Sequence, residues 1–143
     1  MYKSVYYTGY GNDLVSMREA LNKESTTGYC TMTENSLYRV QNLEQCEDYV
    51  PYPKSPERNN IGYYYRVTFP VGQDGFKYTF HLKNPWSRGG VFLMDGKEIY
   101  NSPDPLDFNY ILTLPGQTLN RGNHVLEGFG SGSGDGRGSW RFS

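Results

Sequence analysis

The stretch YYYRVTFPVGQDGFKYTFHL, residues 63–82, decides the fold class of this sequence. Apolar or aromatic side chains alternate with others in residues 63–69 and again in residues 77–82. Alternation with a period of two is typical of a strand that buries one face. Between the two segments, residues 71–76 carry the glycines and aspartate of a turn. The stretch therefore predicts two strands joined by a turn.

The composition agrees with a chain of strands and turns. Its 143 residues include 14 Tyr, 17 Gly and 8 Pro. Helices avoid Gly and Pro, whereas aromatic residues suit strands. The length fits one domain, so we expect a single β-sandwich domain over residues 1–143. Within it, residues 1–60 form a strand–helix–loop segment and residues 61–143 supply most of the strands.

The charge balance and the apolar content exclude several kinds of partner. There are 14 Lys plus Arg and 15 Asp plus Glu, which gives a formal net charge of −1. Nucleic-acid binders usually carry a basic patch, so we expect no nucleic-acid partner. No run approaches the roughly 18 apolar residues of a membrane helix. The first residues lack the apolar core of a signal peptide, so we expect neither membrane insertion nor a signal peptide in this chain.

The first 60 residues predict one strand and the single helix of the chain. Residues 2–7 alternate as a strand does. The helix is expected to begin after Asn12 as its cap, with Leu14, Met17 and Leu21 on one apolar face. After this helix the pattern is irregular.

The rest of the chain reads as short strands separated by turns. One helical turn is predicted at 42–49, a proline-rich loop at 50–60 and a tight Asp-Gly hairpin turn at 95–96. Further strands are predicted at 36–40, 91–94, 97–100, 108–114, 123–129 and 139–142. Strands at this spacing predict a mostly β fold, namely an antiparallel β-sandwich or jelly roll with one short N-terminal helix.

A glycine run near the C-terminus has strand periodicity. Glycine occupies every second position from 128 to 138. A strand with one bare face lets a backbone, an aromatic ring or a sugar ring approach closely. A long hairpin tip is the alternative interpretation.

The two cysteines predict a disulfide. Cys30 and Cys46 lie in a turn-rich segment. Free cysteines are usually buried in apolar runs, and neither of these cysteines lies in one. A bond between them would close a short loop and contribute about 3 kcal/mol. Two free thiols are the alternative. No Cys/His cluster has metal-ligand spacing, so we expect no metal and no cofactor.

The sequence shows no catalytic signature. His81 and His124 are its only histidines, and it contains no HExxH, GxSxG or phosphate-loop motif. We therefore expect a protein that is not an enzyme. A small glycan-acting enzyme remains a third hypothesis, and it needs two carboxylates that face each other across a cleft.

Polar and aromatic residues in the loops are the candidate binding residues. Trp86 stands in a loop beside Asn84, Ser87 and Arg88. A loop tryptophan can stack on a sugar ring or anchor an interface, while burial as a lid over the core is the alternative. The remaining candidates for ligand binding are Asp95, Asp135 and Arg137.

The second half resembles a known family. SRGGVFLMDGKEI (87–99) contains the Asp-Gly-Lys turn, and LTLPGQTLNRGNHVLEGFG (112–130) contains the Leu-x-Gly and His pattern that precedes a strand with Trp140. With the Tyr-x-Phe-x-Leu of residues 78–82, these segments resemble the PA14 family of β-sandwich domains. The resemblance covers about residues 61–143, and residues 1–60 match no family.

One departure limits what this resemblance implies. PA14 lectins hold calcium with an adjacent Asp-Asp pair, and that pair is absent because Ser87-Arg88 fills its place. Calcium needs several oxygen ligands, and an arginine would repel it. The resemblance thus implies the fold and an extracellular or surface-associated location, such as a virion or cell envelope, without the calcium site.

Two functions follow as expectations. The first is a non-catalytic structural or recognition module that adheres or self-assembles as a homo-oligomer or filament in a fibre, matrix or envelope, because tyrosine is enriched at interfaces. The alternative is a lectin-like module whose partner is a glycan held by Trp86 and Arg88 without calcium.

Overall fold

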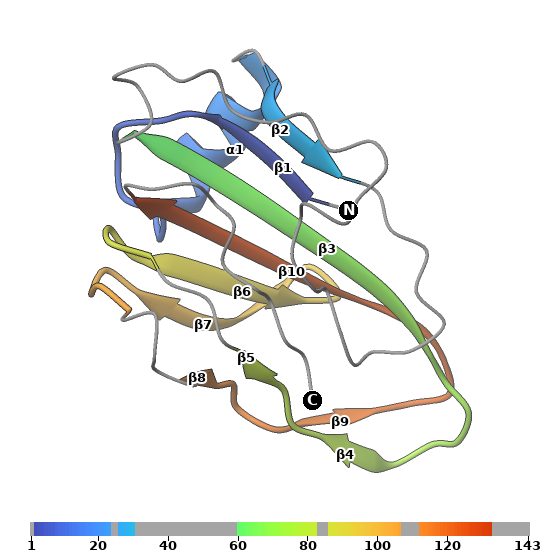
Figure 1. Ribbon diagram of the computed structural model, residues 1–143. Coiled ribbons are helices and arrows are strands. Elements are labelled where there is room, and N and C mark those ends of the chain that lie inside the picture. Colours follow the sequence, from blue (N-terminus) through green and yellow to red (C-terminus); the bar gives the residue numbers. More distant parts are fainter. Residues whose placement is uncertain (1, 24–25, 31–59, 83–85, 107–111, 133–143) are drawn as a thin grey trace.

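The computed structural model describes residues 2–23, 26–30, 60–82, 86–106 and 112–132 (Figure 1). Its helix is α1 (Leu14–Lys23). The strands are β1 (Tyr2–Tyr6), β2 (Thr26–Cys30), β3 (Ile61–Val71), β4 (Phe76–Tyr78), β5 (His81–Leu82), β6 (Gly90–Met94), β7 (Lys97–Ser102), β8 (Leu112–Thr113), β9 (Gln117–Leu119) and β10 (Gly122–Gly132). The mostly β, antiparallel fold with one short helix is confirmed.

Six strands form the main sheet, in the order β2-β1-β3-β10-β6-β7. Every neighbouring pair in it is antiparallel. Its longest members, β3 and β10, run side by side as the central pair of the sheet (Figure 1). The ribbons β4–β9 and β5–β8 make the second layer of the sandwich, continuing from the far ends of β3 and β10.

The alternation of β3 divides the core into two parts. Tyr63, Tyr65 and Phe69 point to the ribbon side, while Tyr64 points to the helix side. The ribbon-side core consists of Tyr63, Tyr65, Phe69, Val71, Phe80, Trp86, Phe92, Met94, Leu112, Leu114, Leu119 and Leu126. The helix-side core consists of Val5, Tyr7, Met17, Leu21, Val91, Leu93 and Phe129. The sheet therefore buries both faces, one under the ribbons and one under α1.

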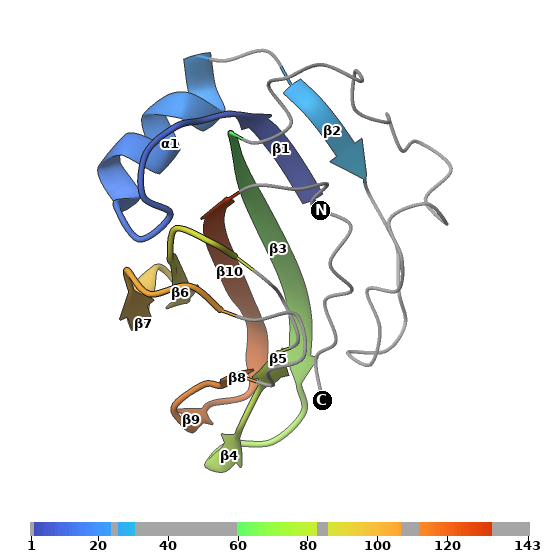
Figure 2. The same ribbon diagram turned by 60° about the vertical axis from the view of Figure 1, so that its left-hand side comes forward.

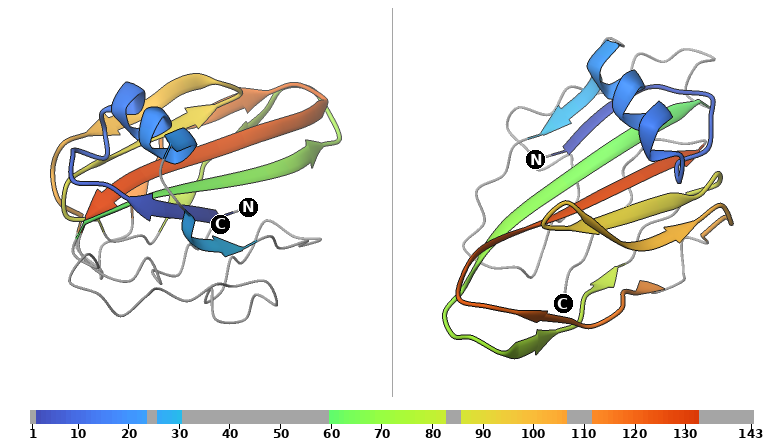
Figure 3. Two further views of the ribbon diagram at one scale, coloured as in Figure 1. Left: turned by 90° about the horizontal axis from the view of Figure 1, so that it is seen from above. Right: turned by 180° about the vertical axis from the view of Figure 1, so that it is seen from behind.

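Helix α1 lies across one end of the sheet (Figure 2; Figure 3, right). Met17 and Leu21, predicted as its apolar face, are buried against the sheet. The predicted cap is wrong by one residue. Asp13 caps the helix, because its Oδ1 accepts the Ser16 backbone N–H at 3.2 Å and its Oδ2 accepts the Ser16 hydroxyl at 2.8 Å. Asn12 instead donates to the Asn101 side chain at 3.1 Å.

The predicted Asp-Gly hairpin joins β6 to β7. Asp95 has φ of 51° and Gly96 has φ of 82°. Two positive φ angles define the turn that best matches the twist of a hairpin, and Asp and Gly adopt them most readily. The Asp95 carboxylate also reaches β10, where it accepts the Val125 backbone N–H at 2.9 Å and lies 2.6 Å from His124 Nδ1.

His124 is held between two acceptors. Its Nδ1 faces the Asp95 carboxylate, and its Nε2 lies 2.6 Å from the Asn120 carbonyl oxygen. Both ring nitrogens must donate to satisfy these contacts, so the geometry favours the imidazolium form. The hydrogen bond to Asp95 raises the pKa of His124. Burial opposes ionisation of Asp95, but hydrogen bonds from His124 and Val125 outweigh it and lower the pKa of Asp95.

Several predicted boundaries change. The expected strand at 77–82 is divided into β4 and β5, and β2 and β9 form where no strand was expected. The predictions at 36–40, 42–49, 50–59 and 139–142 lie outside the described residues. Cys46 lies there too, so the disulfide with Cys30 stays a prediction.

The first glycines of the run lie in a strand rather than a hairpin tip. Gly130 pairs with Tyr63 and with Gly90 across β10. A Cβ on Gly130 would lie 2.6 Å from the Tyr63 ring, and one on Gly90 would lie 2.7 Å from the Trp86 ring. The protein's own Tyr63 and Trp86 rings therefore cover these glycines, and they occupy the space where a sugar ring could otherwise approach.

Arg88 ties together four chain segments at the helix end of the sheet. Its guanidinium donates to the carbonyl oxygens of Tyr7 at 2.9 Å and Gly9 at 3.1 Å. It also donates to Asn60 Oδ1 at 3.1 Å and to Ser131 Oγ at 3.2 Å. Ser131 is fully buried and donates in turn to the Gly9 carbonyl oxygen at 2.8 Å. The side chain therefore fixes the ends of β1 and β10, the start of β3 and the loop before α1.

Replacing Arg88 by alanine is expected to lower the free energy of unfolding by about 2–4 kcal/mol, because partly buried acceptors lose their charged donor. Arg88→Lys should recover only part of the loss, since one ammonium cannot reach all four partners. Urea unfolding measures the change. Arg121→Ala, at an exposed position, is the control and should change it by less than about 0.5 kcal/mol. Equal losses for the two alanine variants would contradict this role.

The Asp95–His124 contact predicts a pH-dependent stability. The raised pKa of His124 adds stability below its ordinary value of 6.5, and this is lost as pH rises through the folded-state pKa. The lowered pKa of Asp95 adds stability above its ordinary value of 3.8, and this is lost as pH falls. The pair therefore stabilises the fold most between these values, by up to about 1 kcal/mol for so exposed a contact.

The measurement is the thermal midpoint at pH about 6 and about 9. His124→Gln should reduce the difference between the two, whereas His81→Gln should keep it. An unchanged difference in His124→Gln would refute the assignment to this pair.

Candidate functional site

The described residues among the predicted binding candidates, namely Trp86, Ser87, Arg88 and Asp95, do not form one binding site. Trp86 is 4% exposed and packs against Phe92 and Tyr100 at ring centroid distances of 5.9 and 6.3 Å. Its indole N–H donates to the Asp104 carbonyl oxygen at 3.0 Å. The indole is thus a lid over the core, and the proposed stacking of Trp86 on a sugar is corrected, because its faces are already covered.

The neighbours of Trp86 are no better placed. Ser87 is exposed, but the Arg88 guanidinium is turned inward to backbone oxygens. Asp95 lies at the other end of β6, a strand of five residues that spans about 17 Å. Asn84, Asp135 and Arg137 lie outside the described residues, so their roles stay predictions.

The residues at the position of the PA14 calcium pair do not fit the ion. Arg88 brings a positive charge there and itself donates to the oxygens of Tyr7, Gly9, Asn60 and Ser131. Calcium requires oxygen ligands that are free to coordinate it. Among the described residues, no group of three or more His, Cys, Asp or Glu side chains could hold a metal ion.

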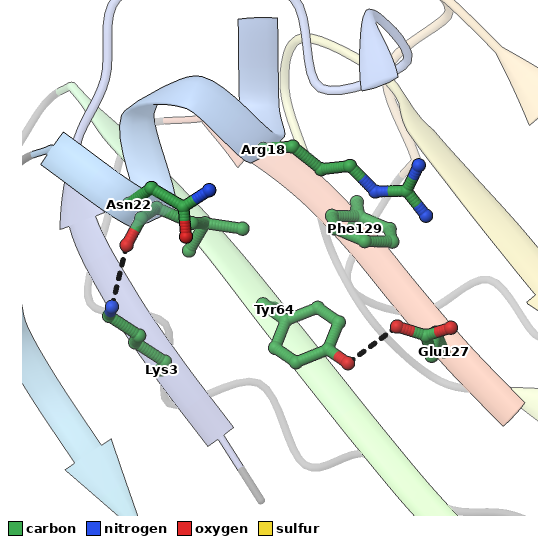
Figure 4. Close-up of a pocket in the computed structure, with 7 residues that line it drawn as sticks. Lys3, Arg18, Asn22, Tyr64, Glu127 and Phe129 are labelled. Atoms are coloured by element: carbon green, nitrogen blue, oxygen red, sulfur yellow. Dashed lines mark hydrogen bonds between the residues drawn. The ribbon is translucent and has the colours of Figure 1, made fainter. Parts of the chain in front are cut away.

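A pocket forms instead on the helix side of the main sheet (Figure 4). Its volume is about 320 Å³. Its lining residues are Lys3, Arg18, Leu21, Asn22, Tyr64, Glu127 and Phe129. They come from β1, α1, β3 and β10, so the pocket exists only where the helix meets the sheet.

Strand register builds the floor of this pocket. Lys3 pairs with Tyr64, and Tyr64 pairs with Phe129, so the three side chains form one row across β1, β3 and β10. The rings of Tyr64 and Phe129 lie 4.9 Å apart between centroids. Phe129 is 2% exposed, whereas Tyr64 is half-buried. Tyr64 is therefore the aromatic surface that a ligand would meet.

Glu127 forms one rim of the pocket beside this ring. The Tyr64 hydroxyl donates to Glu127 Oε2 at 2.6 Å (Figure 4). Burial and this hydrogen bond to a carboxylate raise the pKa of Tyr64, so the phenol stays protonated at any physiological pH. Because the Tyr64 hydroxyl donates to Glu127, the Tyr64 ring is held in one orientation.

Two cations complete the rim, Lys3 from β1 and Arg18 from the middle of α1. Arg18 lies over the Phe129 ring, with its Cζ 5.9 Å from the ring centroid (Figure 4). This is within the range of a cation–π contact. The Lys3 ammonium donates to the Leu21 carbonyl oxygen at 2.6 Å, in the last turn of α1, where a cation satisfies a free carbonyl group.

The pocket thus combines an aromatic surface with charged and amide side chains. Ligand sites are typically concave and mostly apolar, with a few polar groups that fix the orientation of the ligand. Tyr64 and Leu21 supply the apolar part, and Asn22 supplies an amide. Such a site can stack on a sugar ring and hydrogen-bond its hydroxyl groups.

The sequence contains only part of the signal for this pocket. Alternation places Tyr64 and Arg66 on one face of a strand, and Glu127 and Phe129 on one face of another. It does not say which strands are neighbours, nor that Lys3 completes the row. Those facts depend on the pairing register, which no local pattern gives.

No helix in the described part of the chain is long and apolar enough to span a membrane.

No protein-family model and no curated protein matches the sequence. Solved structures do match it. The PA14 domain of the antifreeze protein MpAFP is 13% identical with a TM-score of 0.54, over 98% of this chain and 78% of that one. The PA14 sugar-binding domain of an RTX adhesin is 13% identical with a TM-score of 0.52, over 99% and 85% of the two chains.

A GH31 α-xylosidase from Xanthomonas citri is 14% identical, with a TM-score of 0.47, and this chain spans 14% of its length. The two PA14 domains agree with the mostly β, antiparallel architecture, and the matches cover 98% and 99% of this chain, whereas the sequence resemblance covers only about residues 61–143. This chain has a PA14-like β-sandwich fold.

Proposed function

We propose that the protein is a non-catalytic carbohydrate-recognition module that acts in adhesion at a surface or outside the cell. The observation that carries the proposal is the pocket beside Tyr64, with its aromatic surface and polar rim. The fold supports it, since one structure of similar fold is a sugar-binding domain of an adhesin. The binding site differs from the one expected around Trp86 and Arg88.

The polar groups of the pocket favour binding over hydrolysis. Glycoside hydrolysis normally uses two carboxyl groups that flank the scissile bond. Glu127 is the one carboxylate among the residues that line this pocket. Its bond to the Tyr64 hydroxyl gives it an orienting role.

Location and assembly are further parts of the proposal. The PA14 domains of similar fold come from an antifreeze protein and an adhesin, which supports an extracellular or surface-associated location. Self-assembly into a fibre, matrix or envelope stays a prediction. No contact among the described residues favours it over sugar binding.

A glycan array followed by calorimetric titration tests the function. We expect at least one oligosaccharide to bind, and Tyr64→Ala to weaken its binding about tenfold or more because the stacking surface is lost. Tyr64→Phe keeps the ring and should keep most of the affinity. Tyr10→Ala is the matched control, because Tyr10 is 60% exposed and lies outside the pocket.

Near-ultraviolet circular dichroism and thermal unfolding establish that each variant is folded. A sugar that binds Tyr64→Ala as tightly as the unaltered protein would remove this pocket as the site. Absence of binding to every glycan on the array would refute the function itself.

A further inference from the structure

We infer that the pocket selects an acidic sugar, with Arg18 as the anchor for its carboxylate or sulfate group. This inference rests on the proposed function, because it names the chemical class of the ligand at the same site. It is carried by the charges of the lining residues and by the contacts that hold them.

The Arg18 guanidinium is held in place without its charge being neutralised. It lies over the Phe129 ring, 5.9 Å from the centroid (Figure 4). Arg18 forms no ion pair with any described residue. A guanidinium over an aromatic face keeps its N–H edge available, and that edge matches the two oxygens of a carboxylate or sulfate group.

Positive charge is in excess in the pocket. Lys3 and Arg18 supply two cations, and Glu127 supplies one carboxylate. The whole chain has a formal net charge of −1, so the pocket differs in sign from the average surface. Lys3 donates to a helix carbonyl, a neutral acceptor that leaves its charge uncompensated. A pocket of this sign attracts an anion and disfavours a cationic ligand.

The position of Glu127 sets the orientation of the ligand. Its Oε2 accepts the Tyr64 hydroxyl, while Oε1 accepts no hydrogen bond from the described residues. This oxygen can accept a sugar hydroxyl, and it repels an anionic substituent. The acidic group of the sugar therefore lies at the α1 rim near Arg18, the ring lies over Tyr64, and a hydroxyl group faces Glu127.

The experiment compares acidic and neutral oligosaccharides by titration of the full chain. The carboxylated probes are oligosaccharides of hyaluronan, polygalacturonate and alginate, and the sulfated probe is a carrageenan oligosaccharide. Cello-, xylo-, malto- and chito-oligosaccharides are the neutral probes. The methyl ester of each carboxylated probe is its matched neutral control.

We expect an acidic probe to bind, its methyl ester to bind about tenfold more weakly, and its affinity to fall as salt is raised. Carboxylated and sulfated probes distinguish the two sources of the anion. Arg18→Gln should weaken the acidic probe about tenfold. Arg121→Gln removes an exposed arginine that does not line the pocket, and it should have no effect.

Glu127→Gln gives a second test, in which affinity for the acidic probe should rise where Arg18→Gln lowers it. The amide can still accept the Tyr64 hydroxyl, so the fold should be kept, and loss of the negative charge should tighten binding of the acidic probe several-fold. A site built for a neutral sugar would instead bind more weakly, since it loses a charged acceptor.

The outcomes separate the two proposals. Binding of neutral probes alone, with dependence on Tyr64 but not on Arg18, overturns the acidic class and keeps the carbohydrate function. Equal affinity for an acidic probe and its methyl ester also overturns the acidic class. If no probe binds, both proposals are refuted.

Discussion

The pairing of β3 with β10 is the constraint on which the rest of the molecule depends. Eleven residues pair from Ile61 with Gly132 to Val71 with Gly122. Because side chains alternate, this one register decides what each core contains. It places Tyr63 against Gly130 on the ribbon side and Tyr64 against Phe129 on the helix side. A shift by one residue would exchange the two faces and destroy both the aromatic cover of the glycines and the pocket floor.

Arg88 shows how a different charge can serve the same position in a fold. Where the PA14 resemblance implies two acidic residues around a cation, this chain brings its own cation on a side chain. The guanidinium donates to the carbonyl oxygens of Tyr7 and Gly9, and so it connects the loop before α1 to the end of the sheet. Oxygen atoms of Gly9, Ser131, Asn60 and Tyr7 surround this positive charge, which belongs to the Arg88 side chain and points into the protein.

The sequence predicted those elements whose signals are local. Alternation gave β3, the Asp95-Gly96 pair gave the β6–β7 hairpin, and the spacing of Met17 and Leu21 gave α1. The sequence did not predict features that depend on contacts between residues distant in the chain. For Trp86 the sequence left exposure in a loop and burial as a lid both open, and its burial depends on the missing side chain of Gly90 and on the rings of Phe92 and Tyr100. The pocket depends on Lys3 lying beside Tyr64, which only the register reveals.

The dimensions of the elements explain why a pocket can exist on a face that is otherwise core. α1 has ten residues and is about 15 Å long, whereas β10 has eleven residues and is about 36 Å long. The helix can therefore cover less than half of that strand. Phe129 lies beneath the helix and is buried, and Glu127, two residues earlier on the same face, lies at the edge of the cover and is only half-buried. At the edge of the helix the aromatic floor of the pocket therefore meets charged side chains. Phe129, under α1, is shielded from water, whereas Glu127, beyond the helix, is partly exposed to it.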